Sequence, residues 1–230
     1  MLRSIKQFYG RKLAASDGDI GEIKDFHFDD QGWTIRYVVV DAGNGRQVLL
    51  TPHALGMLDQ PDTLLRVNLT LKQIEQGPSL EPQKPISRQF EEVYYRYYGW
   101  PFYWHGNELW GRTGVPVPEA ASGITATLPA EQTETAAVHP DSGNGPLRSV
   151  RAVTGYQFRT RSGIVGHVSD FMMDPQSWAI GQLSVRTGHR LSGAEVLVAT
   201  KNVERIIHEE SVVFGELTTH QPAALSAVSQ

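Results

Sequence analysis

One short stretch, "SDGDIGEIKD", combines carboxylates and glycines and is the first place where metal or phosphate chemistry could be expected. Asp17, Asp19 and Asp25 supply the carboxylates, and Gly18 and Gly21 supply the bends. A calcium loop of the EF-hand type needs oxygen ligands at alternate positions and a closing glutamate, and a phosphate-binding P-loop needs a Lys-Ser/Thr pair. The stretch has neither arrangement, so we interpret its glycines as residues that turn geometry requires.

The remaining candidates for chemistry are histidine, serine and aspartate. The eight histidines are scattered, and no HExxH or comparable pair would hold zinc. No GxSxG sequence marks a nucleophilic serine, and the lack of cysteine excludes disulfides, thiolate zinc sites and cysteine nucleophiles. We predict no catalytic residue, no metal site and no cofactor, and therefore a protein that is not an enzyme.

An aromatic run, "YYRYYGWPFYW", covers residues 94–104 and places eight rings in eleven positions of a chain that is 9% aromatic. Tyr and Trp are enriched among the residues that dominate protein interfaces, so one interpretation is a protein-docking surface. The residues that we predict to form it are Tyr95, Tyr98, Trp100, Tyr103 and Trp104. In the alternative interpretation, Phe90, Val93, Tyr94 and Tyr97 form a stripe that seals a barrel end or an interface between barrels.

Two other uses of the rings are disfavoured by charge. Stacking on single-stranded nucleic acid needs a basic groove, but Glu91, Glu92 and Glu108 oppose Arg88 and Arg96 near the run. A membrane-surface helix needs a basic face, which is also missing. We expect no nucleic acid partner.

The composition is that of an ordinary globular protein. Its 230 residues are 40% hydrophobic and 20% charged, with 21 Lys and Arg against 25 Asp and Glu. No stretch approaches the roughly 20 apolar residues of a membrane-spanning helix, and no apolar signal segment stands at the start of the sequence. We expect a cytoplasmic location, with peripheral association with a membrane complex as one way of reaching a partner.

The chain repeats itself. "LRSIKQFYGRKLAASDGDIGEIKDFHFDDQGWTIRYVVV", from Leu2, aligns without a gap to "LRSVRAVTGYQFRTRSGIVGHVSDFMMDPQSWAIGQLSV", from Leu147, at an offset of 145 residues. Farther on, "LRVNLT" at Leu65 resembles "VFGELT" at Val213, at an offset of 148. The chain therefore contains two copies of one module rather than many short repeats.

Each copy has the signals of short strands and tight turns. β-branched and aromatic residues flank the polar sequence "DDQG", which predicts a hairpin of residues 21–28 and 33–40. Asn44-Gly45 suits a type I′ turn, because both residues tolerate positive φ. Many short antiparallel strands at close spacing indicate a small barrel. The fold class that we predict is mainly β, with two small antiparallel barrels and short helices.

Two helices are predicted after the first set of strands. Thr70 and Gln73 have capping-box spacing before a short helix. Ser87 is a good N-cap for a helix of residues 88–98, which Gly99 followed by Trp100-Pro101 should end.

The predicted domains follow from these signals. A first barrel covers residues 1–80, a helix and aromatic tail cover 81–105, and a flexible linker rich in Ala, Thr, Pro, Gly, Ser and Glu covers 106–145. A second barrel covers 146–222 and a loose tail covers 223–230.

The two copies resemble the PRC-barrel, the small β-barrel of the photosynthetic reaction-centre H subunit and of the bacterial ribosome maturation factor. The shared pattern is Ile or Val before Gly, then Asp before an aromatic residue, a Trp, and a Val-Leu strand. The residues that carry it, which we predict to be structural, are Gly21, Asp25, Phe26, Trp33, Gly166, Asp170, Phe171 and Trp178. Both Trp residues are expected to fill equivalent core positions. The resemblance implies an adaptor, because barrels of this kind dock onto larger assemblies.

We therefore expect a bacterial, non-catalytic adaptor or scaffold that binds protein partners, with a homodimer through residues 94–104 as one form of association. One alternative is a reaction-centre H subunit-like part of a photosynthetic electron-transport assembly. The other is an enzyme or ligand-binding protein that uses a cleft between barrels, with Asp25, Asp170 or a histidine as its polar group.

Overall fold

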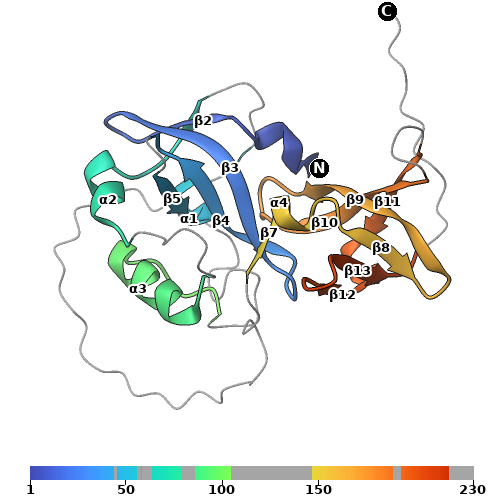
Figure 1. Ribbon diagram of the computed structural model, residues 1–230. Helices are drawn as coiled ribbons and strands as arrows, with labels where there is room; N and C mark the ends of the chain where they lie inside the picture. The colour runs from blue at the N-terminus through green and yellow to red at the C-terminus, as the bar shows by residue number, and fades with distance from the viewer. Residues whose placement is uncertain are drawn as a thin grey trace, which may run out of the picture. The chain divides into compact units, whose positions relative to one another are not determined.

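The structure is a computed structural model that describes residues 1–43, 46–55, 58, 64–78, 86–104, 147–188 and 193–217 (Figure 1). The predicted Asn44-Gly45 turn, the linker of residues 106–145 and the tail of residues 223–230 lie outside these residues. Within the described part, the fold is mainly β, as predicted, with two sheets and short helices, and neither sheet closes into a barrel there. No helix of the described part is long and apolar enough to cross a membrane.

The chain forms two compact units that do not coincide with contiguous halves of the sequence. The N-terminal unit consists of Phe8–Ser149 together with Pro175–Ala179. The C-terminal unit consists of Val150–Asp174 and Ile180–Gln230 together with Met1–Gln7. The predicted domains differ from these units: one short segment of the first repeat and two of the second belong to the unit built mainly by the other repeat.

The N-terminal unit contains a six-stranded sheet of order β5-β4-β3-β2-β6, with β7 beside β3. Its strands are β2 (Lys12–Ala14), β3 (Asp19–Asp29), β4 (Thr34–Asp41), β5 (Gln47–Leu50), β6 (Leu65–Arg66) and β7 (Arg148–Ser149). Its helices are α1 (Pro52–Leu55), α2 (Leu71–Gln76) and α3 (Arg88–Tyr98). The long β3–β4 hairpin confirms the predicted pairing across "DDQG", with Phe26 opposite Val38. Seven consecutive residues of β4, from 34 to 40, are buried, so this strand is the centre of the core.

The C-terminal unit contains a seven-stranded sheet of order β11-β10-β9-β8-β13-β12, with β1 beside β9. Its strands are β1 (Arg3–Ser4), β8 (Gln157–Thr160), β9 (Gly163–Met173), β10 (Ile180–Thr187), β11 (Glu195–Ala199), β12 (Val203–Ile207) and β13 (Val212–Gly215). α4 (Val150–Val153) and the 3-10 helix η3 (Thr200–Asn202) complete it, and a second 3-10 helix, η1 (Ile5–Phe8), follows β1. The parallel pair β8–β13 matches the parallel pair β2–β6, with Phe158 opposite Val213 and Leu13 opposite Leu65. The five strands that the two sheets share thus have the same order, and β12 has no counterpart in the described part of the N-terminal unit.

Gly21 and Gly166 are required by close strand contact rather than by the turns that we predicted. Both lie within strands, and a Cβ on Gly21 would lie 1.8 Å from the carbonyl oxygen of Asp41. A Cβ on Gly166 would lie 2.1 Å from the carbonyl oxygen of Arg186. Because Asp41 and Arg186 are also 145 residues apart, the same close approach occurs in each repeat.

The two repeat tryptophans do not fill equivalent core positions, which corrects that prediction. Both have positive φ, 49° for Trp33 and 61° for Trp178. Trp178 is fully buried, whereas Trp33 is half-buried and stacks on Phe28 at a centroid distance of 5.6 Å. The carbonyl of Trp178 accepts a hydrogen bond from the Ile35 N–H at 2.9 Å, which ties the 175–179 segment to β4.

Candidate functional site

Helix α3 and the aromatic segment after it begin and end as the sequence predicts. The Ser87 hydroxyl accepts a hydrogen bond from the Phe90 N–H, and Gly99 ends the helix in the left-handed region with φ 71°. The Trp100 N–H then donates to the Tyr95 carbonyl at 3.0 Å, which turns the chain back along the helix. The shorter helix α2 likewise has the predicted capping box of Thr70 and Gln73.

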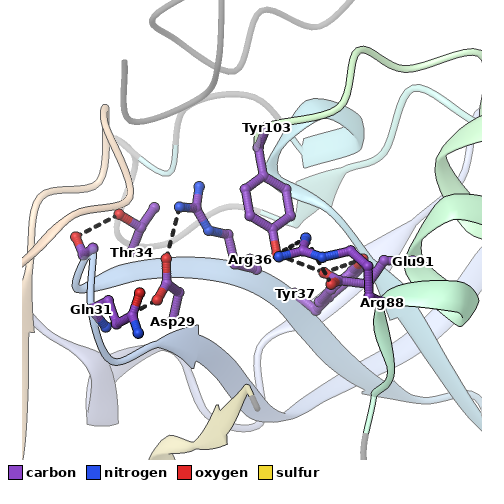
Figure 2. Close-up of polar contacts among 9 residues, drawn as sticks. Asp29, Gln31, Thr34, Arg36, Tyr37, Arg88, Glu91 and Tyr103 are labelled. Carbon is purple, nitrogen blue, oxygen red and sulfur yellow. Dashed lines mark hydrogen bonds and ion pairs between the residues drawn. The ribbon is translucent and has the colours of Figure 1, made fainter. Parts of the chain in front are cut away.

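A buried carboxylate, Glu91, is the centre of a polar cluster between α3 and β4 (Figure 2). The Tyr37 hydroxyl donates to its Oε1 at 3.1 Å, and the Tyr103 hydroxyl donates to the same oxygen at 2.8 Å. The Arg88 guanidinium lies 3.2 Å from the second oxygen. Burial raises the pKa of Glu91, and the hydrogen bond from Tyr103 and the charge of Arg88 oppose that rise.

A second buried charge, Arg36, lies next to this cluster. Its guanidinium pairs with Asp29 at 3.1 Å, and both side chains are buried. The same guanidinium lies 3.9 Å from the centre of the Tyr103 ring, a cation–π distance. Figure 2 shows Arg36 between Asp29 on one side and the Tyr103 ring on the other. The Tyr103 side chain therefore links the Arg36–Asp29 pair to the Glu91 cluster.

Arg36, Glu91 and Tyr103 occur once in the chain, although the modules are repeated and Asp174 stands where the first repeat has Asp29. At the offset of 145 residues, Gly181 stands where the first repeat has Arg36. Glu91 and Tyr103 lie after the repeated part of the first module. The cluster is therefore a property of the N-terminal unit and not of the shared module.

A ring stack lies beside the polar cluster. Tyr98 and Trp100 are parallel at a centroid distance of 4.5 Å, and Trp100 also stacks on His53 at 5.9 Å. Burial, and after it the positive charge of Arg36, lowers the pKa of His53 to about 4. His53 is therefore neutral at pH 7 and contributes ring surface rather than charge.

The five residues predicted to form a docking surface have different surroundings. Tyr95 and Tyr103 are buried, whereas Tyr98, Trp100 and Trp104 are half-buried. The rings lie close to one another, with Tyr95 within 6.2 Å of Trp100 and 5.6 Å of Trp104 between centroids. Tyr95 and Tyr103 are thus part of the interior, and Tyr98, Trp100 and Trp104 remain candidates for contact with a partner.

The prediction for the helix stripe was wrong about its direction. Of Phe90, Val93, Tyr94 and Tyr97, only Tyr94 is buried, and its hydroxyl donates to the Leu49 carbonyl at 2.6 Å. Val93 is 58% exposed and Tyr97 is 43% exposed. The helix instead buries Glu91, Tyr94 and Tyr95. Sequence pattern misplaced the face because it treats a glutamate as a surface residue, whereas two tyrosine hydroxyls and an arginine satisfy this one in the interior.

The aspartates of the repeated motif have local structural roles. Asp25 accepts a hydrogen bond from the Phe26 N–H, and Asp170 accepts one from the Phe171 N–H, each at 2.8 Å. Both phenylalanine rings are fully buried. The second carboxylate oxygen of each aspartate accepts a serine hydroxyl, from Ser149 at Asp25 and from Ser4 at Asp170.

Sequence reasoning missed Arg36, Asp29 and His53, and it gave Glu91 only as a negative charge opposing Arg88 and Arg96. The signal for Arg36 was present, because it interrupts the apolar strand sequence "TIRYVVV". An arginine inside such a strand requires a buried partner. The partner could not be chosen from sequence, since Asp29 and Tyr103 are 7 and 67 positions away.

The arrangement holds side chains in place rather than offering them to a substrate. Both oxygens of Glu91 already have donors, and the Arg36 guanidinium already has an anion and a ring. Among the residues that the structure describes, no three His, Asp or Glu side chains gather as metal ligands. Neither a protein-family model nor a curated protein matches this chain.

Proposed function

We propose that the protein is a non-catalytic adaptor, and that a partner protein receives the outer face of α3 in an apolar groove. The observation that carries this proposal is the stripe formed by the exposed Val93 and Tyr97 and the half-buried Phe90. These residues have the i, i+3, i+7 spacing with which helices anchor in grooves. Val93 and Tyr97 are exposed to water on a helix whose opposite face is already buried. A partner that covers them removes apolar surface from water, which is favourable for binding.

The polar residues around the stripe suggest the chemistry of the groove. Arg96 and Gln89 are exposed on the same helix, and Trp100 and Trp104 add half-buried rings beyond its end. Arg, Tyr and Trp are the residues most enriched among interface hot spots. The fitting partner therefore has an apolar groove with carboxylates on its rim.

The buried cluster supports the same function by making α3 rigid. Glu91, Tyr94 and Tyr95 attach the inner face of the helix to β4 and β5 through hydrogen bonds and ring contacts. A helix that is already ordered loses little conformational entropy when a partner covers its outer face. We assign the cluster the role of positioning the exposed stripe.

The proposal extends to the fold family. Matching strand orders, the parallel pairs β2–β6 and β8–β13, and the shared glycine contacts support two PRC-type barrels. PRC barrels dock onto larger assemblies, which agrees with an adaptor.

Photo-crosslinking in cells that express the protein tests the proposal. A photoreactive residue at Val93 should give an adduct of defined mass, and Tyr97→Asp in the same chain should reduce its yield at least tenfold. The matched control is a photoreactive residue at Leu197, a 46% exposed apolar residue of the C-terminal unit, which should give no such adduct. Equal products from both positions, or none from Val93, would refute the proposal. An adduct of twice the chain mass would assign the groove to a second copy.

A further inference from the structure

Each sheet contains a two-residue strand from the other repeat. In the C-terminal unit, Arg3 lies opposite Met173 and Ser4 opposite Met172, in the antiparallel pair β1–β9. In the N-terminal unit, β7 pairs with β3 in the same way, with Arg148 opposite Phe28 and Ser149 opposite His27. Each of the four positions in one pairing has its counterpart 145 residues away in the other pairing. The same pairing of a short segment with a long strand therefore occurs twice.

The docked segment, Leu-Arg-Ser, is recognised by more than its backbone. The Ser4 hydroxyl donates to Asp170, and the Ser149 hydroxyl donates to Asp25 at 2.5 Å. Arg148 also pairs with Asp30 at 2.9 Å. Leu2 lies against Gly181 of β10, where a Cβ would lie 2.9 Å from a Leu2 methyl carbon. The serine therefore has a defined place in both units, the leucine in the C-terminal unit and the arginine in the N-terminal unit.

The aspartates are prepared for this contact. One oxygen of Asp170 is held by the Phe171 N–H, which leaves the other directed to the serine. β8 pairs with the start of β9, from Gly163 to His167, and β1 pairs with its end, at Met172 and Met173. Without β1, this end of β9 would present unpaired backbone groups, which are the usual template for strand addition.

We propose that the end of β9 is a strand-addition site for Leu2-Arg3-Ser4 of a second copy of this chain, so that two chains exchange these segments. The site already accepts a segment from outside its own repeat. The division between the units falls between Gln7 and Phe8, so the segment and the next strand of its own repeat, β2, belong to different units. A segment from another chain would make the same hydrogen bonds, which makes such an exchange a low-cost route to a dimer. This proposal does not depend on the role of α3.

Complementation between two full-length variants tests the exchange. Ser4→Pro removes the hydroxyl and a backbone N–H of the segment but leaves the β9 site intact. Gly181→Leu fills the place of Leu2 but leaves the segment intact. Each variant alone should be a monomer by light scattering, whereas an equimolar mixture should form a 1:1 dimer that grows with concentration. A mixture that stays monomeric, with both variants folded by their melting curves, would overturn the proposal.

Disulfide trapping gives a second test if either variant fails to fold. The chain has no cysteine, so Arg3→Cys with Met173→Cys adds the only pair, at directly opposed strand positions that a disulfide can bridge. Oxidation after equilibration should give disulfide-linked dimers, and the dimer-to-monomer ratio should rise about tenfold for a tenfold rise in concentration while dimers are scarce. Crosslinks that are intramolecular at every concentration would overturn the proposal.

Discussion

Replacing Glu91 should reveal how strongly the polar cluster holds α3. Glu91→Ala leaves the hydroxyls of Tyr37 and Tyr103 without their acceptor, and both residues are buried. An unsatisfied buried hydroxyl costs about 1–3 kcal/mol. The loss of the partly buried Arg88 pair adds to this, so we expect the free energy of unfolding to fall by about 3–5 kcal/mol.

Urea denaturation followed by tryptophan fluorescence measures the free energy of unfolding of each variant, and further variants separate the contributions to the loss. Glu91→Gln keeps an acceptor oxygen and should cost only about 1–2 kcal/mol. Glu92→Ala, at the neighbouring half-exposed residue, is the matched control and should change stability by less than about 0.5 kcal/mol. In a Tyr103→Phe background, Glu91→Ala should cost about 1–3 kcal/mol less than in the wild type.

Two results would refute this reasoning. The first is an effect of Glu91→Ala that is no larger than that of Glu92→Ala. The second is equal destabilisation by Glu91→Ala with and without the Tyr103 hydroxyl. Either would mean that ring packing alone anchors α3.

Three further perturbations follow from the structure. The pKa of His53 is about 4 in the folded protein and 6.5 in the unfolded chain, so only the unfolded chain takes up the proton as pH falls from 6.5 to 4. Wild type should therefore lose up to about 3 kcal/mol more stability than His53→Phe between pH 7 and pH 4, measured by denaturation at each pH, and equal losses would contradict the assignment. Gly21→Ala should cost about 2–4 kcal/mol, because Gly21 has positive φ and its Cβ would also meet the Asp41 carbonyl, whereas Gly10→Ala should cost only about 1–2 kcal/mol, because Gly10 has positive φ but open space. Melting curves that rank the two alike would exclude an added cost from the contact. Ser87→Ala should cost about 1 kcal/mol in urea denaturation, and Ser87→Asp should restore most of it, unless the cap has no role in α3.

Local signals predicted the helices well because their determinants are neighbours in the sequence. Ser87 and Gly99 define the ends of α3, and Thr70 and Gln73 define the start of α2, through hydrogen bonds that span at most a few residues. The β3–β4 hairpin was predictable for the same reason, since a short turn joins two strongly apolar strands.

The inward face of α3 could not be predicted, because it depends on partners far along the chain. Glu91 is buried only because Tyr37, 54 positions before it, and Tyr103 supply donors. The predicted stripe combined residues of two faces, because Tyr94 is buried whereas Val93 and Tyr97 are exposed. The pattern of apolar and polar residues indicates that a helix has two different faces. The residues that pack against the helix in the fold decide which of these faces is buried.

The sequence by itself determined that this chain consists of two copies of a small mainly β module, with glycine and aspartate at matching positions. Those features are repeated along the chain and depend on local strand and turn chemistry. Only the tertiary structure decided that Leu-Arg-Ser of each repeat adds to the sheet built mainly by the other repeat. The physical reason is that a strand edge accepts any segment with the right backbone and side chains, and sequence does not state which of two identical segments reaches it.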